Sequence, residues 1–275
     1  MLAFLSWRGL GNQMFVQIEI STKCNYGCFY CAGRDMPQKQ MSWELFTSIL
    51  SKLSPDTRVV SLQGEGEPML HPRFWDMVDA VFAVGKLPYT ITNGSALIDP
   101  DRVALKFKEV GISIDTLDAQ LAENIGRYDL ARVLRNLDGL LAKMSPSRVL
   151  IHTVDFGQEL ADIRQFTAAR GLRHFVQPLQ SKADYAYRYG EVASHGPCTY
   201  NCSVLATKGN GYFDIEGREL PCCFIKDLSK FESRERLVSQ LADKEVPSCC
   251  DGCPMIFPQA GRGPNKQSLI ARFQQ

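Results

Sequence analysis

The feature that most constrains this chain is the uneven distribution of its ten cysteines. Three of them, Cys24, Cys28 and Cys31, lie near the N-terminus. The other seven all lie in the last third of the sequence, at positions 198, 202, 222, 223, 249, 250 and 253, and the 166 residues between the two groups contain none. In a reducing compartment this clustering argues against a disulfide framework and predicts two metal centres joined by a cysteine-free scaffold.

The bulk composition limits the classes of partner. With 275 residues, 45% of them hydrophobic, the chain can bury one large core, with or without an appendage. Because 31 basic residues face 30 acidic ones, no global field attracts nucleic acid or an anionic membrane. Residues 1–8 lack the basic start of a signal peptide, and no segment approaches the roughly 18 apolar residues of a membrane span. We therefore expect a cytoplasmic protein.

Between the cysteine groups, short β-branched runs alternate with amphipathic stretches, the pattern of βα units around a parallel sheet. Six strands are expected, over 15–21, 58–63, 89–92, 112–115, 149–154 and 173–177. Helices are expected between them, over 43–53 behind Ser42 as N-cap and over 73–84, 102–110, 130–144 and 160–170. Since the rhythm stops near residue 180, we expect an α/β partial (β/α)6 barrel, not a closed eight-fold one.

The alternation of strand and helix patterns ends after residue 180. Lys208-Gly209-Asn210-Gly211 predicts a hairpin turn, and helical periodicity is weak until about residue 231. We place a boundary within 181–197, so that residues 1–180 form the barrel and residues 181–275 form a small cysteine-rich β-hairpin extension. Residues 261–266 are expected to be a loose tail.

The first three cysteines directly follow the first expected strand, at the strand end where α/β barrels place their chemistry. A [4Fe–4S] cluster usually takes four thiolates, so three leave one iron able to accept a small chelating ligand. A thioredoxin-like pair at Cys28 and Cys31 would leave Cys24 unexplained. A zinc knuckle usually needs a fourth ligand, and none lies nearby in the sequence. An open-iron cluster is the best interpretation.

The Cys-x3-Cys-x2-Cys spacing, with an aromatic residue before the last cysteine, resembles the radical S-adenosylmethionine (SAM) superfamily over about residues 15–180. The resemblance implies that the reduced cluster cleaves SAM and that the resulting 5′-deoxyadenosyl radical abstracts hydrogen from a substrate. It also implies that Tyr30 contacts the adenine of SAM.

Three further segments carry the resemblance. Gly64-Glu65-Gly66-Glu67-Pro68 is similar to the Gly-Gly-Glu-Pro element that holds the methionine amino group of SAM through the backbone and Glu67. Thr92-Asn93-Gly94 and Ser113-Ile114-Asp115 match places where the family contacts the SAM ribose, which implies roles for Asn93, Ser113 and Asp115. Taken alone, the first segment is equally an acidic turn, and an Asn-Gly turn is common.

The C-terminal cysteines resemble the SPASM or twitch extensions of this superfamily, which carry auxiliary [4Fe–4S] clusters. Because no cysteine follows Cys253, a single auxiliary cluster is expected. The resemblance assigns as ligands Cys202, Cys222, Cys250 and Cys253. Cys198 is the rival to Cys202, and a four-cysteine zinc site is the alternative, since four thiolates suit zinc equally well.

Three C-terminal cysteines remain: Cys198, Cys223 and Cys249. The last two each adjoin an expected ligand, and adjacent side chains in extended backbone point to opposite sides. One of them is therefore able to face the SAM cavity and return a hydrogen atom to a carbon radical, because an S–H bond is weaker than most C–H bonds. The alternative for each is a small buried hydrophobe.

Three reactions compete: epimerisation, dehydrogenation and peptide crosslinking. Peptide-modifying relatives usually carry a leader-binding domain and a second auxiliary cluster, so a small-molecule substrate is favoured. Leu220-Pro221-Cys222 with the later CxxC resembles aminocyclitol dehydrogenases of butirosin biosynthesis. The additional Cys249 resembles radical SAM epimerases of neomycin biosynthesis, which implies inversion of a ring carbon in an aminoglycoside 2,6-diaminosugar with Cys249 as catalytic hydrogen donor.

An epimerase of this kind implies an external electron donor such as flavodoxin or ferredoxin. A polycationic aminoglycoside also needs carboxylates in its site, and strand alternation places Glu19, Asp115 and His152 toward the barrel lumen. The alternative from another class is a non-enzymatic iron or zinc protein, such as a redox regulator, which would not cleave SAM.

Overall fold

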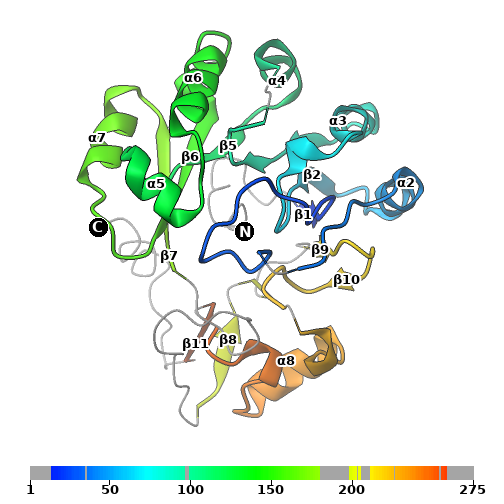
Figure 1. Ribbon diagram of the computed structural model, residues 1–275. Coiled ribbons are helices and arrows are strands. Elements are labelled where there is room, and N and C mark those ends of the chain that lie inside the picture. Colours follow the sequence, from blue (N-terminus) through cyan, green and yellow to red (C-terminus); the bar gives the residue numbers. More distant parts are fainter. Residues whose placement is uncertain are drawn as a thin grey trace.

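The computed structural model describes residues 14–34, 36–96, 99–179, 198–202, 204–205, 211–225, 227–253 and 255–258. Within these residues, a curved wall of mostly parallel strands carries helices on its outer side (Figure 1). The expected α/β partial barrel is therefore confirmed. The proposed boundary at 181–197, the turn residues 208–210 and the tail at 261–266 lie outside the described residues.

The barrel wall consists of two parallel strand groups. The first contains β1 (Met14–Ile18), β2 (Thr57–Leu62) and β3 (Leu87–Tyr89). The second contains β4 (Ile91–Thr92), β5 (Val110–Ser113), β6 (Val149–Asp155) and β7 (Arg173–Pro178). Only Thr90 separates β3 from β4, so the single strand expected over 89–92 is divided between the two groups. The Thr90 hydroxyl donates to the carbonyl of Leu62 across this break, at 2.9 Å.

The five expected helices are present with shifted ends. They are α2 (Trp43–Lys52), α3 (Phe74–Ala83), α4 (Pro100–Lys106), α6 (Leu130–Leu141) and α7 (Ala161–Ala169). Ser42 caps α2 as expected, because its side chain accepts from the Leu45 amide. The sequence analysis missed α5 (Ala119–Ile125), a short helix capped by Asp118. Short 3₁₀ turns are η2 (Pro68–Leu70), η3 (Pro146–Arg148), η4 (Leu228–Lys230) and η5 (Ser248–Cys250).

The main core lies between the helices and the outward faces of the strands. Fully buried apolar side chains from β2 and from the helices meet there, among them Val60, Leu62, Phe46 and Leu137. Because side chains alternate along a strand, Ser61, between Val60 and Leu62, points to the opposite side, into the barrel. The core thus holds the strands while leaving their inner faces for polar groups.

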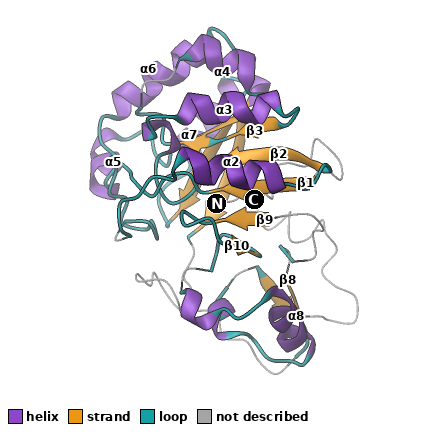
Figure 2. Cartoon of the chain, turned by 90° about the vertical axis from the view of Figure 1, so that its right-hand side faces the viewer, coloured by secondary structure: helices purple, strands orange, loops and turns teal. Residues whose placement is uncertain are grey.

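The C-terminal residues add to the barrel wall. A hairpin is formed by β9 (Gly211–Phe213) and β10 (Glu219–Leu220), but its turn spans 214–218, whereas the turn was expected at 208–211, where Gly211 instead begins β9. The strand β9 pairs in parallel with β1, with Tyr212 opposite Gln17. The hairpin is thus part of the barrel sheet as well as of the C-terminal segment. A smaller unit contains β8 (Tyr200–Cys202), α8 (Arg234–Ala242) and β11 (Ile256–Pro258), below the barrel in Figure 2. Among the described helices, none has the length and apolar character that crossing a membrane requires.

Candidate active site

The loop that follows β1 carries Cys24, Cys28 and Cys31 and is fastened on two sides. The amides of Gly27 and Phe29 donate to the C-terminal end of α5, each at 3.0 Å. Cys24 Sγ accepts from the Tyr26 amide at 3.4 Å. These bonds hold the loop at the carboxyl ends of the strands, as the sequence predicted.

The chemistry of this loop fits an iron–sulfur cluster. Its three thiols interact electrostatically with one another, and burial raises the pKa of both Cys24 and Cys31 in the metal-free chain. A backbone amide and the Asn93 side chain, whose Nδ2 lies 3.8 Å away, both donate toward Cys24 Sγ. Such donors suit a thiolate ligand. Among the described residues, no three His, Cys, Asp or Glu side chains converge as they would around a single metal ion.

The segment Gly64–Pro68 crosses directly over the cysteine loop. Gly66 donates its amide to the Ser21 carbonyl and Glu67 donates its amide to the Lys23 carbonyl, at 3.1 and 2.9 Å. A Cβ on Gly66 would lie 2.6 Å from both of those carbonyl oxygens, so only glycine fits this crossing. A Cβ on Gly64 would meet the Glu19 side chain at 2.3 Å. The two glycines therefore let this turn lie in close contact with residues 19–23, which follow β1.

Glu67 is fully buried, and its carboxylate is held by protein donors. The Thr92 hydroxyl, the Asn93 amide and the Met69 amide donate to it at 2.7, 2.6 and 3.0 Å. Burial nevertheless raises its pKa. Glu67 thus joins the turn containing Pro68 to the end of β4, and most of its acceptor capacity is used within the protein.

Asn93 links the end of β4 to the cysteine loop. Its side chain donates to Asn25 Oδ1 at 2.9 Å, and its Oδ1 accepts from the amide and hydroxyl of Ser95. Asn25 in turn donates to the Ser95 hydroxyl at 2.8 Å. Asn93, which was expected to contact the ribose, therefore also stabilises the loop between Cys24 and Cys28.

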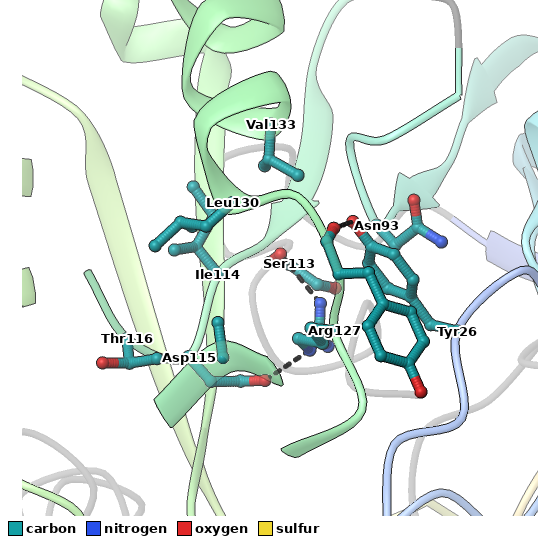
Figure 3. A pocket seen from close by; sticks show the side chains of 11 residues that line it. Tyr26, Asn93, Ser113, Ile114, Asp115, Thr116, Arg127, Leu130 and Val133 are labelled. Carbon is teal, nitrogen blue, oxygen red and sulfur yellow. Dashed lines mark hydrogen bonds and ion pairs between the residues drawn. The ribbon is translucent and has the colours of Figure 1, made fainter. Parts of the chain in front are cut away.

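Tyr30, Ser113 and Asp115 converge on Arg127, a residue that the sequence analysis missed. Arg127 pairs with the Asp115 carboxylate at 2.6 Å and donates to the Ser113 carbonyl at 3.0 Å (Figure 3). It also donates to the Tyr30 hydroxyl at 3.1 Å. The Tyr30 hydroxyl also donates to Asp115. Burial is the largest single influence and lowers the pKa of Arg127, but the interactions with Asp115, Tyr30 and Cys28 together outweigh it and raise that pKa well above its usual range.

A pocket lies beside this group. It is lined by the ends of β4 and β5, by the cysteine loop and by the start of α6, and the residues include Tyr26, Asn93, Ser113, Asp115, Arg127 and Tyr128. Figure 3 shows Arg127 joined to Asp115 and to Ser113 beside this pocket. The pocket encloses only about 10 Å³, about the size of one water molecule, and its lining contains three of the residues expected to contact SAM.

The C-terminal cysteines gather in one part of the structure. Cys222 interacts electrostatically with Cys202 and Cys253, and Cys250 interacts with Cys222 and Cys253, so the four expected ligands are neighbours. They share an apolar cluster with Tyr200, Tyr212 and Leu220. Cys198, the rival ligand, packs on the same cluster, and its thiol hydrogen-bonds Tyr200.

The two spare cysteines have different surroundings. Cys249 is buried beside Ile225 and Leu237, with its Sγ 3.9 Å from Cys250 Sγ. Cys223 is equally buried but lies in the neighbouring cluster, within electrostatic range of Tyr212. The expected opposite orientation of neighbouring thiols is wrong for Cys249, because Cys249 and Cys250 lie in the 3₁₀ turn η5 and not in extended backbone, and their sulfur atoms are neighbours.

The three residues expected in the lumen, Glu19, Asp115 and His152, differ in how far their side chains are engaged within the protein. Glu19 is buried and accepts from the Glu65 amide at 2.7 Å. Asp115 is engaged by Arg127 and Tyr30, and it also accepts from the Val154 amide at 2.8 Å. His152 lies on the inner face, where burial lowers its pKa to about 3. The lumen therefore holds a carboxylate and a neutral imidazole.

Comparison with known proteins identifies the class. The profile of the Radical SAM superfamily matches residues 18–168, more than half of the chain, and these residues contain the cysteine loop and the barrel described above. The protein therefore belongs to the radical SAM superfamily.

Its relatives are diverse in their named activities. The chain is 25% identical over 189 residues to a GTP 3′,8-cyclase of Sulfurimonas denitrificans, covering 61% of this chain and 56% of the relative. It is 26% identical over 144 residues to an S-adenosylmethionine-dependent nucleotide dehydratase of Selenomonas ruminantium, covering 50% and 53%. The chain thus spans about half the length of the curated relatives it matches.

Solved structures agree on the fold. SuiB of Streptococcus suis, bound to S-adenosylmethionine, superposes with a TM-score of 0.65 at 15% identity, covering 84% of this chain and 65% of SuiB. At this identity the likeness shows the fold and leaves substrate and reaction open.

Proposed function

We propose that this radical SAM enzyme is an epimerase that inverts a ring carbon of an aminoglycoside 2,6-diaminosugar, as in conversion of neomycin C to neomycin B. The proposal depends on one observation: Cys249 is surplus to the four-cysteine group, yet its Sγ lies 3.9 Å from Cys250 Sγ. A hydrogen-donating thiol beside a redox centre is what inversion needs and what simple oxidation does not.

The first site would hold a [4Fe–4S] cluster on Cys24, Cys28 and Cys31, with SAM on its open iron. When bound and reduced by flavodoxin or ferredoxin, the cluster supplies the electron that divides SAM into methionine and a 5′-deoxyadenosyl radical. In this assignment Tyr30, Asn93, Ser113 and Asp115 bind the nucleoside part of SAM, and Gly64, Gly66, Glu67 and Pro68 shape the methionine side. Arg127 is added as the residue that positions Tyr30 and Asp115.

Inversion then needs two hydrogen-atom transfers on opposite faces of the sugar ring. Bound SAM would supply the radical that removes the first hydrogen atom from the ring C–H, and this removal would leave 5′-deoxyadenosine and a planar carbon radical. The Cys249 S–H returns a hydrogen atom from the other face. The thiyl radical left on sulfur is restored to the thiol by one electron from the external flavodoxin or ferredoxin and one proton from water. An auxiliary [4Fe–4S] cluster beside that sulfur would be held by Cys202, Cys222, Cys250 and Cys253.

The proposal also assigns residues 1–180 to the barrel domain and residues 181–275 to the auxiliary domain. It assigns the protein to the cytoplasm.

Turnover in D2O tests the reaction. Because a thiol hydrogen exchanges with water, product made in D2O should gain one mass unit at the inverted carbon, with one SAM consumed per product. Cys249→Ala should retain iron and still release 5′-deoxyadenosine while inversion fails. Cys223→Ala is the matched variant, because Cys223 is equally buried and also adjoins an expected ligand. Its loss of inversion activity should be smaller than that of Cys249→Ala.

The second candidate is an aminocyclitol or sugar-alcohol dehydrogenase. The same four-cysteine group favours this reaction if a cluster held there accepts the electron that oxidation of the substrate releases. That reaction would give a product two mass units lighter, and its observation would contradict the epimerase. Because named relatives act on GTP or on nucleotides, GTP is the substrate control. Turnover of GTP, without change in the aminoglycoside, would also contradict the proposal.

A further inference from the structure

The inner faces of β1 and β2 carry a layer of uncharged polar side chains that the cysteine and SAM sites do not use. Gln17, Ser61 and Gln63 are 2%, 0% and 3% exposed. Gln17 lies opposite Ser61 in the strand register, and Gln63 follows Ser61 by two residues, so all three point to the same side of the sheet. We call these three residues the amide layer.

The amide layer is left short of hydrogen bonds. Gln17 Nε2 donates to the Gln63 carbonyl at 3.2 Å, but Gln17 Oε1, Ser61 Oγ and both side-chain polar atoms of Gln63 lack a partner. The other two such atoms among the described residues belong to Asp79 and Glu109, whose carboxylates form ion pairs. Leaving neutral buried amides unpaired is costly, so these atoms indicate a missing partner.

The layer is surrounded by anchored polar groups on neighbouring strands. Tyr212 of β9 lies opposite Gln17, and its pKa is raised well above the usual range by burial and by its hydrogen-bonded neighbour Glu19. Tyr89 of β3 lies opposite Ser61, and its hydroxyl is 3.3 Å from His152 Nε2. Donors, acceptors and one carboxylate therefore share the inner face.

Glu19, two residues after Gln17 on the same face of the β1 segment, links the neighbourhood of the amide layer to the first cysteine site through Glu65. Glu19 accepts from the Glu65 amide at 2.7 Å, and the Cys31 thiol is 3.8 Å from the Glu65 carbonyl. Gln63 also directly precedes the Gly64–Pro68 segment that crosses the cysteine loop. The amide layer thus lies below the site where the radical would form, on the side of the barrel interior.

From this arrangement we infer that the amide layer is the substrate subsite and that its ligand is a ring bearing vicinal hydroxyl and amino groups. A hydroxyl both donates and accepts, so a polyhydroxylated ring satisfies two amides and a serine together, and an ammonium group pairs with Glu19. An apolar ligand would leave most of these atoms unpaired. The inference deepens the proposed function and rests on it for the location of the reacting carbon.

Calorimetric titration of the anaerobic holoenzyme tests the subsite with neomycin C, 2-deoxystreptamine and GTP as probes. Gln63→Met and Ser61→Ala should weaken binding of neomycin C by about tenfold or more, because each leaves a ligand group unpaired. SAM affinity and iron content should not change. Thr90→Val is the matched control: Thr90 is fully buried between β3 and β4 but already donates to Leu62. It should leave binding of every probe unchanged.

Thermal unfolding without substrate gives a second readout. If the layer awaits a ligand, Gln63→Met and Ser61→Ala should raise the unfolding temperature of the ligand-free protein, whereas Thr90→Val should lower it. Unchanged neomycin C and 2-deoxystreptamine affinity in both variants would overturn the subsite, as would failure of both probes to bind the wild-type protein or a layer-dependent preference for GTP.

The two proposals fail separately. If neomycin C binds through the amide layer but is not inverted, the epimerase is wrong and the subsite stands. If neomycin C is inverted with D2O incorporation while the amide-layer variants bind and turn over normally, the epimerase stands and the subsite is wrong.

Discussion

Arg127 Nε lies 2.6 Å from Asp115 Oδ2, and both side chains are largely buried. Asp115 lies just after β5 and Arg127 just after α5. The same guanidinium reaches the Tyr30 hydroxyl on the cysteine loop. One cation therefore joins β5, the end of α5 and the loop that carries the first three cysteines.

Arg127→Met should destabilise the protein by about 3–5 kcal/mol, because it leaves the Asp115 carboxylate buried without its cation. Urea unfolding under anaerobic conditions measures this loss. The double variant Arg127→Met/Asp115→Asn removes both charges and should recover part of the stability. A single variant as stable as the wild type would show that the ion pair does not support the loop.

Gly66→Ala should abolish SAM binding, since the added Cβ would lie 2.6 Å from two carbonyl oxygens of the cysteine-loop backbone. Gly139→Ala is the control, because a Cβ at this exposed position in α6 meets nothing within 4 Å outside its own helix. It should stabilise the protein by about 0.5–1 kcal/mol. Equilibrium dialysis with SAM and thermal unfolding compare the two variants. Normal SAM binding by Gly66→Ala would contradict the crossing described above.

Anaerobic reconstitution should give about eight irons per chain, as two [4Fe–4S] clusters require. Replacing Cys24, Cys28 and Cys31 together by alanine should remove about half of the iron and end SAM cleavage. Tight zinc binding at both sites with no SAM cleavage would exclude this assignment.

Cys202→Ala should empty the auxiliary site and leave the first cluster, whereas Cys198→Ala should retain both. Cys202 is among the thiols that interact with Cys222, while the Cys198 thiol bonds Tyr200. Iron analysis with Mössbauer spectroscopy distinguishes the sites. The opposite pattern would move the ligand set to Cys198.

His152 should make stability fall as the solution becomes acidic. Its pKa is lowered by burial from 6.5 to about 3, so the unfolded chain binds its proton first as pH falls. Stability is therefore fully present above about pH 6.5 and declines through the range down to about pH 3. In His152→Gln this contribution should be absent, giving a shallower decline than the wild type between pH 6.5 and 4.5 in matched urea titrations. Equal slopes would mean that His152 is protonated in the folded state.

The barrel could be predicted because its signals are local. Ser42 before an apolar-periodic stretch predicts α2, and β-branched runs predict β2 and β6 at nearly their observed bounds. The cysteine loop was equally local, since spacing alone assigns Cys24, Cys28 and Cys31 to one turn after β1. Such features need no knowledge of the rest of the chain.

Arg127 and β9 were missed because their partners are distant. Arg127 meets Tyr30 across 97 residues of sequence, and no periodicity marks such a contact. The Asp118 cap followed by Gly126 at φ 96° was the available signal for α5, and a basic residue directly after it was the signal for Arg127. The strand β9 has only three residues, too few to show alternation.

The pairing of β9 with β1 has a consequence for biosynthesis. The ribosome releases Val16 long before Gly211, its partner in the parallel ladder, so one edge of the first strand waits without a hydrogen-bonding neighbour while most of the chain is made. An open strand edge recruits other chains, and a nascent barrel cut at residue 180 would keep that edge permanently. The first 180 residues of this enzyme should therefore be a poor candidate for separate expression, because the barrel sheet is completed only when the β9–β10 hairpin has been made.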